Sequence, residues 1–317
     1  MPSLRDPLLH ITDPDLRPFL QQWDLRGGTA PFSADEKRDA YLAGVARFGP
    51  AQAVPETWDR TITGPGGPIP LRIYQPRSDR SEPLPVLVYL HGGGFISGGL
   101  DTHDPVCRTL AHQIPAVVVA VQYRLAPEFP YPAAHEDAYA ALCFAQREAD
   151  DWGGHPDELY VAGDSAGGLL AAAVTLRAKR EAGPSIRRQV LIYPMLDATM
   201  SSPSLVSNGL IPPFTLLDCV HVWQQYLGSF HDRQNEQVSP LLASDLSGLP
   251  ATLVVTAGLD ILRDEGKTFA ERLQHSGVPV QWREYPSMVH GFFQWYGTVQ
   301  AARSAMDDVV NFLQSSC

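Results

Sequence analysis

A serine flanked by glycines, Gly163-Asp164-Ser165-Ala166-Gly167, stands between a short apolar run and a long segment rich in Ala and Leu. The apolar run 159–162 predicts a buried strand, and residues 166–181 predict a helix that ends near Gly183. An abrupt turn from strand to helix crowds the residues two before and two after it and exposes the residue at its apex. The pattern therefore restricts this segment to a strand–turn–helix unit of an α/β fold, with Ser165 at the turn.

A second glycine-rich turn, His91-Gly92-Gly93-Gly94-Phe95, follows another apolar run, 86–90. A serine becomes a useful nucleophile when a base takes its proton, and bare glycine N–H groups can stabilise an oxyanion. Together the two turns predict acyl transfer at Ser165. Each turn alone is also compatible with an ordinary glycine-rich loop. A phosphate-binding loop is disfavoured, because the chain lacks both Gly-Lys-Ser/Thr and Gly-x-Gly-x-x-Gly followed by an acid.

A serine of this kind needs a histidine base, which in the strand–turn–helix arrangement follows the serine in the chain. Four histidines do so: His221, His231, His275 and His290. His221 and His231 fall in or beside a predicted helix. His275 ends another helix, where its charge suits the helix C-terminus. His290 follows the predicted strand 279–285 on a loop, so it is the predicted base; a buried structural histidine is the alternative.

The histidine in turn needs a carboxylate partner. Asp260 follows the predicted strand 252–257, at the strand end where α/β folds place their sites. Asp264 and Glu265 come one helical turn later and are more simply explained as first-turn carboxylates that stabilise a helix N-terminus. Asp260 is therefore the predicted acid, with Asp264 as the second candidate.

These motifs, taken with the segments Tyr123–Glu128 and Ser239–Leu241, resemble the bacterial hormone-sensitive-lipase-like carboxylesterases in their GDSAG branch, from about Val54 to the end. The resemblance implies the α/β-hydrolase fold, with a mostly parallel eight-stranded sheet flanked by helices and a helical cap. It implies a serine carboxylesterase for short- to medium-chain acyl esters. One departure is Ile261, where members commonly have proline; a proline there only presets a helical dihedral angle.

The resemblance also implies the roles of individual residues. Ser165, Asp260 and His290 would form the catalytic triad. The main-chain N–H groups of Gly93, Gly94 and Ala166 would bind the oxyanion, with Gly92 as a close contender that also contacts substrate, while His91 would brace the loop. The aromatic residues predicted to line the substrate pocket are Phe95, Phe32, Phe214 and Trp223. This chemistry requires no cofactor and no metal.

Short apolar strands alternate with helices through most of the chain. Strands are predicted at 58–63, 69–74, 86–90, 117–122, 159–162, 189–193, 252–257 and 279–285. The first two are expected to form an antiparallel hairpin and the later ones to be parallel. Residues 1–50 are expected to form N-terminal cap helices, with a capping box at Ser33, and residues 51–317 the catalytic domain. The connection after 193 is too long for a plain crossover, so a cap insertion is predicted at about 196–235.

The formal net charge of −11 argues against nucleic-acid binding, because the sequence offers no basic stripe to neutralise phosphates. The N-terminus lacks the pattern of a signal peptide, and no apolar stretch is long enough to span a bilayer. The four scattered cysteines are typical of a reduced, cytoplasmic protein. We expect a small-molecule ester as partner and no membrane, and the sequence leaves a homodimer open as an assembly. An amidase or formamidase on the same fold, or a non-catalytic small-molecule receptor, are the alternative functions.

Overall fold

The central sheet of the computed structural model, which describes residues 11–16, 33–76 and 82–315, has the strand order β1-β2-β4-β3-β5-β6-β7-β8. Its strands are β1 Glu56–Gly64, β2 Gly67–Gln75, β3 Leu84–Leu90, β4 Val117–Val121, β5 Gly154–Asp164, β6 Ile186–Ile192, β7 Ala251–Ala257 and β8 Val280–Tyr285. Strand β2 pairs antiparallel with β1 and β4, and all other neighbours are parallel. The predicted mostly parallel eight-stranded sheet and its hairpin are confirmed.

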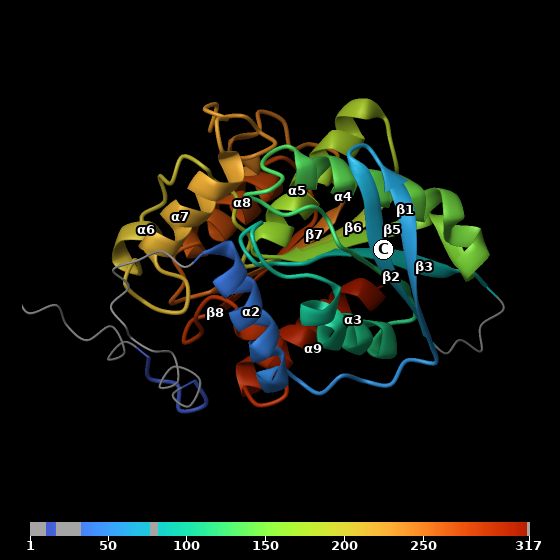
Figure 1. Ribbon diagram of the computed structural model, residues 1–317, viewed down its shortest axis with the longest axis horizontal. Helices are drawn as coiled ribbons and strands as arrows, with labels where there is room; N and C mark the ends of the chain where they lie inside the picture. Colours follow the sequence, from blue (N-terminus) through green and yellow to red (C-terminus); the bar gives the residue numbers. More distant parts are fainter. Residues whose placement is uncertain (1–10, 17–32, 77–81, 316–317) are drawn as a thin grey trace, which may run out of the picture.

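Helices cover both faces of this sheet (Figure 1). Their bounds are α2 Ala34–Gly44, α3 Leu100–Gln113, α4 Ala133–Glu148, α5 Ala166–Glu181, α6 Ser204–Ser207, α7 Leu216–Leu227, α8 Arg263–His275 and α9 Gln300–Gln314, with 3-10 turns η2 Val45–Arg47, η3 Ala149–Trp152, η4 Pro240–Leu242 and η5 Phe292–Trp295. In Figure 1, α4, α5 and α8 lie on one side of the sheet, and α3 and α9 lie on the other.

The central strand β3 shows why the sheet is buried on both faces. Successive side chains of a strand point to opposite faces. Val86, Val88 and Leu90 accordingly join the apolar cluster shared with α4, α5 and α8, whereas Leu87 and Tyr89 join the cluster shared with α3 and α9. A strand that is buried on both faces has a nearly continuous run of apolar residues in its sequence. This explains why strands buried on both faces, such as β4 and β7, could be predicted from the sequence alone.

Two segments outside the sheet lie near the ends of its parallel strands. Helix α2 begins at the predicted capping box, in which Ser33 accepts a hydrogen bond from the Glu36 N–H and Glu36 reaches back to the Ser33 N–H. The long connection between β6 and β7 carries α6 and α7. Helix α7 begins at Leu216, directly after Thr215, which forms a second capping box with Asp218.

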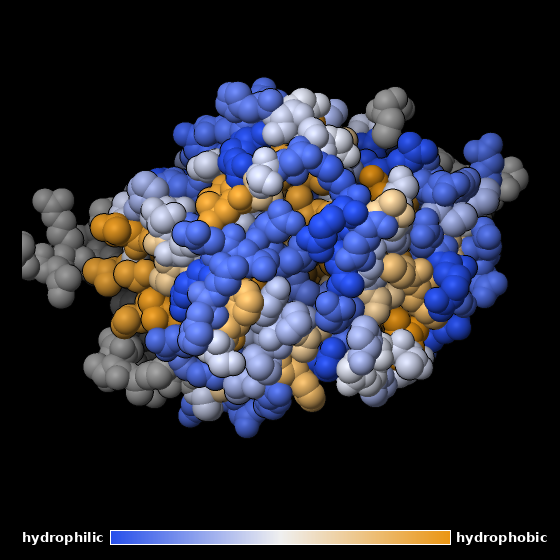
Figure 2. Space-filling view, turned by 90° about the horizontal axis from the view of Figure 1, so that it is seen from above, coloured by the Kyte–Doolittle hydropathy of each residue, from blue (hydrophilic) through white to orange (hydrophobic). Residues whose placement is uncertain are grey.

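The connection that carries α6 and α7 also leaves apolar side chains at the surface. Val206, Leu210 and Leu217 are well exposed. In Figure 2, apolar side chains gather at the end of the molecule where Figure 1 places α6 and α7. In the described part of the chain, no helix is both long and apolar enough to cross a bilayer.

Candidate active site

Ser165 occupies the turn between β5 and α5, with a φ of 55°. A positive φ is uncommon for a residue with a side chain and marks a strained turn. The glycines on either side are required by space. A Cβ on Gly163 would lie 2.2 Å from the Gly167 carbonyl oxygen, and a Cβ on Gly167 would lie 2.0 Å from the Leu90 carbonyl oxygen. The close packing of β5, α5 and β3 therefore explains the Gly-x-Ser-x-Gly spacing.

The structure brings the predicted serine, histidine and aspartate together. His290 Nε2 lies 2.9 Å from Ser165 Oγ, and His290 Nδ1 lies 2.7 Å from Asp260 Oδ2. The other Asp260 oxygen accepts the Leu262 N–H at 2.9 Å, and the carboxylate is buried. These residues follow β5, β7 and β8, so the parallel strand ends of the sheet assemble them.

Aromatic rings hold the imidazole of His290 between them. The ring of Tyr193 lies 4.8 Å from it and the ring of Phe214 also lies 4.8 Å from it, measured between centroids. Tyr193 follows β6, whereas Phe214 comes from the segment before α7. The imidazole is thus fixed by one hydrogen bond at each nitrogen and by apolar contact with two rings.

The other candidate acids and bases have different partners. Asp264 pairs with Arg263 at 2.8 Å, and His275 caps its own helix through the Glu271 carbonyl oxygen. Glu265 lies in the first turn of α8 as predicted, but its side chain is buried and does more than complement the helix. Its Oε2 accepts the N–H groups of Leu196 and Asp197, at 2.6 and 3.0 Å. It therefore ties α8 to the chain that follows β6.

Gly93 and Gly94 lie beside Ser165 on the wall of one cavity, with φ values of 121° and 64°. A Cβ on Gly93 would lie 2.2 Å from the Ser97 carbonyl oxygen, so the tight turn excludes a side chain there. Gly92, by contrast, does not line the cavity, and its N–H donates to Asp164 Oδ1 at 3.0 Å. Because that N–H is already used, Gly92 is not available as an oxyanion donor, and the structure does not support the expectation that it contacts substrate.

A buried polar network lies behind the glycine loop. The Asp164 carboxylate also accepts the Tyr89 hydroxyl at 2.9 Å and lies 3.2 Å from His103 Nε2. Burial by itself raises the pKa of the Asp164 carboxyl, but the neighbouring His103 and the hydrogen bond from Tyr89 more than offset this, so the pKa lies below its ordinary value. His103 Nε2 further lies 2.8 Å from the Gln294 side-chain nitrogen. The carboxylate beside Ser165 is therefore ionised and fixed against the glycine loop.

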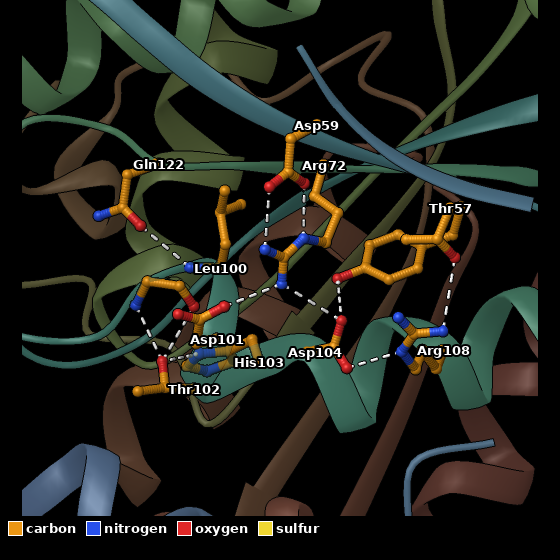
Figure 3. A network of polar contacts seen from close by, with 12 residues as sticks. Thr57, Asp59, Arg72, Leu100, Asp101, Thr102, His103, Asp104, Arg108 and Gln122 are labelled. Atoms are coloured by element: carbon orange, nitrogen blue, oxygen red, sulfur yellow. Dashed lines mark hydrogen bonds and ion pairs between the residues drawn. The ribbon is translucent and has the colours of Figure 1, made fainter. Parts of the chain in front are cut away.

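Polar contacts also anchor the beginning of helix α3, which carries His103 (Figure 3). The Leu100 N–H donates to the Gln122 side chain at 3.0 Å. Arg72 of β2 donates to Asp59 at 2.7 Å and to Asp101 at 2.9 Å. These bonds attach the first turn of α3 to the sheet, so the position of His103 is set by the fold and not by a flexible loop.

His91, the first residue of the glycine loop, is buried and stacks on Tyr123 with 4.1 Å between ring centroids. Its Nδ1 lies 2.8 Å from the Gly92 carbonyl oxygen. Burial, and to a lesser extent the charge of the nearby His103, lower the pKa of His91 to about 3, so the ring is neutral at ordinary pH. These contacts agree with the expectation that His91 braces the loop.

The cavity above Ser165 has a volume of about 490 Å³. Of the four aromatic side chains predicted to line it, only Phe214 does so among the described residues, and Phe32 lies outside them. Phe95 is fully buried and stacks on Tyr226 at 3.7 Å, and Trp223 is 1% exposed within the same apolar cluster. Both expectations were wrong, because these rings fill the core beneath the cavity.

Sequence reasoning missed the contribution of α2 to the cavity. Its lining residues recur at helical spacing, and they are Lys37, Ala40, Tyr41 and Gly44. This spacing is a signal that the sequence contained, but these residues are too polar and too small to form an obvious apolar stripe. Tyr193, Gln294 and Trp295 complete the wall near His290. Nothing in the sequence pattern distinguishes them from core residues.

Comparisons with known proteins agree with this architecture. A family described as the alpha/beta hydrolase fold matches residues 87–294. Esterase LipI of Mycobacterium tuberculosis is 42% identical over 251 residues, which cover 78% of each chain. An ethyl acetate hydrolase of Pseudomonas putida is 38% identical over 80% of each chain.

Solved structures give the same result over nearly the whole chain. A hyperthermophilic esterase of Pyrobaculum calidifontis superposes with a TM-score of 0.87 and 38% identity, covering 95% of this chain and 97% of that one. A thermostable esterase of Pseudomonas putida superposes with a TM-score of 0.88 at 32% identity, covering 95% of this chain and 96% of that one. The chain therefore belongs to the hormone-sensitive-lipase-like carboxylesterase family of the α/β-hydrolase fold, and it is a carboxylic ester hydrolase.

Proposed function

We propose that this enzyme hydrolyses short- to medium-chain acyl esters through a triad of Ser165, His290 and Asp260. The observation that carries the proposal is the continuous chain of hydrogen bonds from Ser165 Oγ to His290 and on to the buried Asp260, which begins in the cavity. The nucleophile, its base and the base's partner are thereby within the distances that such catalysis requires.

The reaction begins when Ser165 Oγ attacks the ester carbonyl carbon and His290 Nε2 takes the hydroxyl proton. Asp260 keeps a proton on Nδ1 and stabilises the imidazolium as it forms. His290 then gives its proton to the leaving alkoxide, so the alcohol departs and an acyl-enzyme remains. A water molecule deprotonated by the same imidazole attacks the acyl carbon and releases the acid and the free serine.

The carbonyl oxygen becomes an oxyanion in each tetrahedral intermediate, and we assign its donors to the N–H groups of Gly93, Gly94 and Ala166. Gly93 and Gly94 line the cavity beside Ser165. Ala166 is the first residue of α5, where N–H groups lack acceptors inside the helix and the helix dipole favours negative charge. Fixed donors of this kind typically contribute about 3 kcal/mol each to the stability of the transition state.

The cap is proposed from the same cavity. Helix α2 and the segment before α7 contribute Lys37, Tyr41 and Phe214 to its wall. A cap of this kind limits the substrate by size and shields the reacting atoms from water. The division into cap helices at 1–50, a catalytic domain at 51–317 and a cap insertion at about 196–235 is part of this proposal.

The proposal is tested with 4-nitrophenyl esters of increasing acyl length and the matching 4-nitroanilides. We expect turnover of the esters, and turnover of the anilides that is at least about a hundredfold slower. The anilide nitrogen is a poorer leaving group and must be protonated by the same general acid before it departs. Comparable rates on both series would support an amidase instead. Ligand binding without turnover of either series would support a receptor.

A further inference from the structure

Helix α2 and the 3-10 turn η2 that follows it form part of the cavity wall, and this segment carries a positive charge toward each end. Ala40 and Gly44 leave space near the middle of this segment, while Lys37 and Arg47 lie toward its two ends. Arg47 is exposed, so solvent screens its charge. Lys37 is partly buried, which makes its charge the more effective of the two inside the cavity.

The Lys37 ammonium lies on the side of the cavity near the catalytic histidine. It lies 5.8 Å from the centre of the Phe214 ring, and that ring lies 4.8 Å from the His290 imidazole. Within the described part of the chain, no hydrogen bond or ion pair ties the ammonium to another residue. A charge withdrawn from water without a bonded partner is unfavourable, so an incoming anion would compensate it.

The nearest acidic side chain is already engaged. Asp218 lines the same cavity, but its Oδ2 accepts the N–H of Thr215 at 2.9 Å and the hydroxyl of Thr215 at 2.6 Å, as the cap of α7. Burial lowers the pKa of Lys37, while the charge of Asp218 opposes that shift without coming within ion-pair distance. The cavity thus presents an ammonium group beside a carboxylate that is committed to holding a helix.

We propose that Lys37 is a specificity-determining residue that recognises a carboxylate on the substrate. The preferred substrates are then esters that carry a second, free acid group at the end of the acyl chain. Because the negative charge of the nearby Asp218 repels anions, a substrate with one negative charge is favoured over a substrate with two. This inference rests on the proposed function, because it places the ester carbonyl at Ser165 and the free carboxylate at Lys37.

Three methyl esters of matched length test the proposal: monomethyl adipate, methyl hexanoate and methyl 6-aminohexanoate. Their chains end in an anion, a methyl group and a cation. With acid release followed at constant pH, we expect kcat/KM for monomethyl adipate to exceed that for the amino ester by about tenfold or more, the value of one charge-assisted contact. Equal values, or a preference for the amino ester, would overturn the proposal.

Variants then assign the preference to one side chain. Lys37→Met keeps the length and apolar stem of the residue and should reduce the ratio of anionic to cationic ester turnover by about tenfold, mainly through KM. Lys37→Arg keeps the positive charge and should retain most of the preference for the anionic ester. The matched control is Lys267→Met, which removes the same charge from an exposed position of α8 and should leave the ratio unchanged. Equal effects of the Lys37→Met and Lys267→Met variants would mean that only the overall charge matters.

The outcomes separate this inference from the proposed function. If methyl hexanoate is hydrolysed and the three esters show no dependence on charge, the carboxylate subsite is wrong and the esterase mechanism stands. If Ser165→Ala hydrolyses all three as fast as the wild type, the mechanism itself fails, and the inference with it. The melting temperature of each variant, measured alongside, identifies any loss of activity that comes from unfolding.

Discussion

Asp260 and Asp264 lie one helical turn apart, yet they have different surroundings. Asp260 is buried and bonded to His290, whereas Asp264 is partly exposed and paired with Arg263. Asp260→Asn should lower kcat by about three to four powers of ten, because an amide favours the wrong imidazole tautomer. Asp264→Asn should leave kcat within about threefold of the wild type and should lower stability slightly. Steady-state kinetics on a 4-nitrophenyl ester measure kcat for both variants. A larger loss of kcat in Asp264→Asn than in Asp260→Asn would identify Asp264 as the triad acid.

Glu265 makes the stability of the protein depend on pH. Burial raises the pKa of its carboxyl well above the ordinary value, although two main-chain N–H groups oppose this. A carboxyl with a raised folded-state pKa stabilises the fold fully below the unfolded-state pKa, and that contribution is lost as the pH rises through the folded-state pKa. In Glu265→Gln, the decline of unfolding free energy between pH 5 and pH 8 should shrink by about 1 kcal/mol or more. Unchanged denaturation curves at both pH values would contradict this.

Single residues differ in how far the sequence alone could place them. Ser165, His290 and Asp260 could be chosen from residue type, chain order and position after a strand, because parallel strands bring their C-terminal ends to one edge. The orientation of Phe95 could not be chosen in the same way. Glycines precede it, and its φ of 62° turns its ring onto Tyr226 in the core. Local sequence carries no information about a contact of that kind.

Among the structural elements, helix α3 has a second role besides packing on the sheet. It delivers His103 to Asp164, whose carboxylate fixes the N–H of Gly92 next to the proposed oxyanion donors. We infer that His103 is a positioning residue. Its side chain does not line the cavity, so it acts through Asp164 and the glycine loop.

His103→Asn should lower kcat by about tenfold while changing KM for the same ester much less, because a loosened glycine loop weakens contacts made mainly in the transition state. The matched control is His112→Asn, the same substitution on an exposed position of the same helix, which should change neither constant. A large rise in KM with unchanged kcat would show that His103 acts on substrate binding instead.

The strands could be predicted more accurately than the helices of the cap. An apolar run covered on both faces has a clear start and end, as β4 and β7 show. Helix α7 instead begins in a polar capping box at Thr215, and polar and apolar residues are interspersed along it. Helix α2 presents small and charged residues to the cavity, so its part in the site was not recognisable from periodicity.

At the scale of the whole molecule, the cavity volume limits the substrate. A space of about 490 Å³ matches a compact small molecule. Each added methylene should gain roughly 0.8 kcal/mol until the cavity is filled. Catalytic efficiency on neutral 4-nitrophenyl esters should therefore rise, reach a maximum between about two and eight acyl carbons, and then fall. Faster hydrolysis of emulsified long-chain triglyceride than of dissolved short esters would contradict this and indicate a lipase.

The most direct test of the mechanism is covalent labelling by a 4-nitrophenyl alkylphosphonate, which a serine activated by a histidine attacks at phosphorus with loss of nitrophenolate. Mass spectrometry of the intact protein should show one adduct per chain, and peptide mapping should locate it on Ser165. Ser165→Ala should take up no label and retain less than about a hundredth of wild-type turnover. An adduct on another residue, or a Ser165→Ala variant that still forms one, would contradict the account.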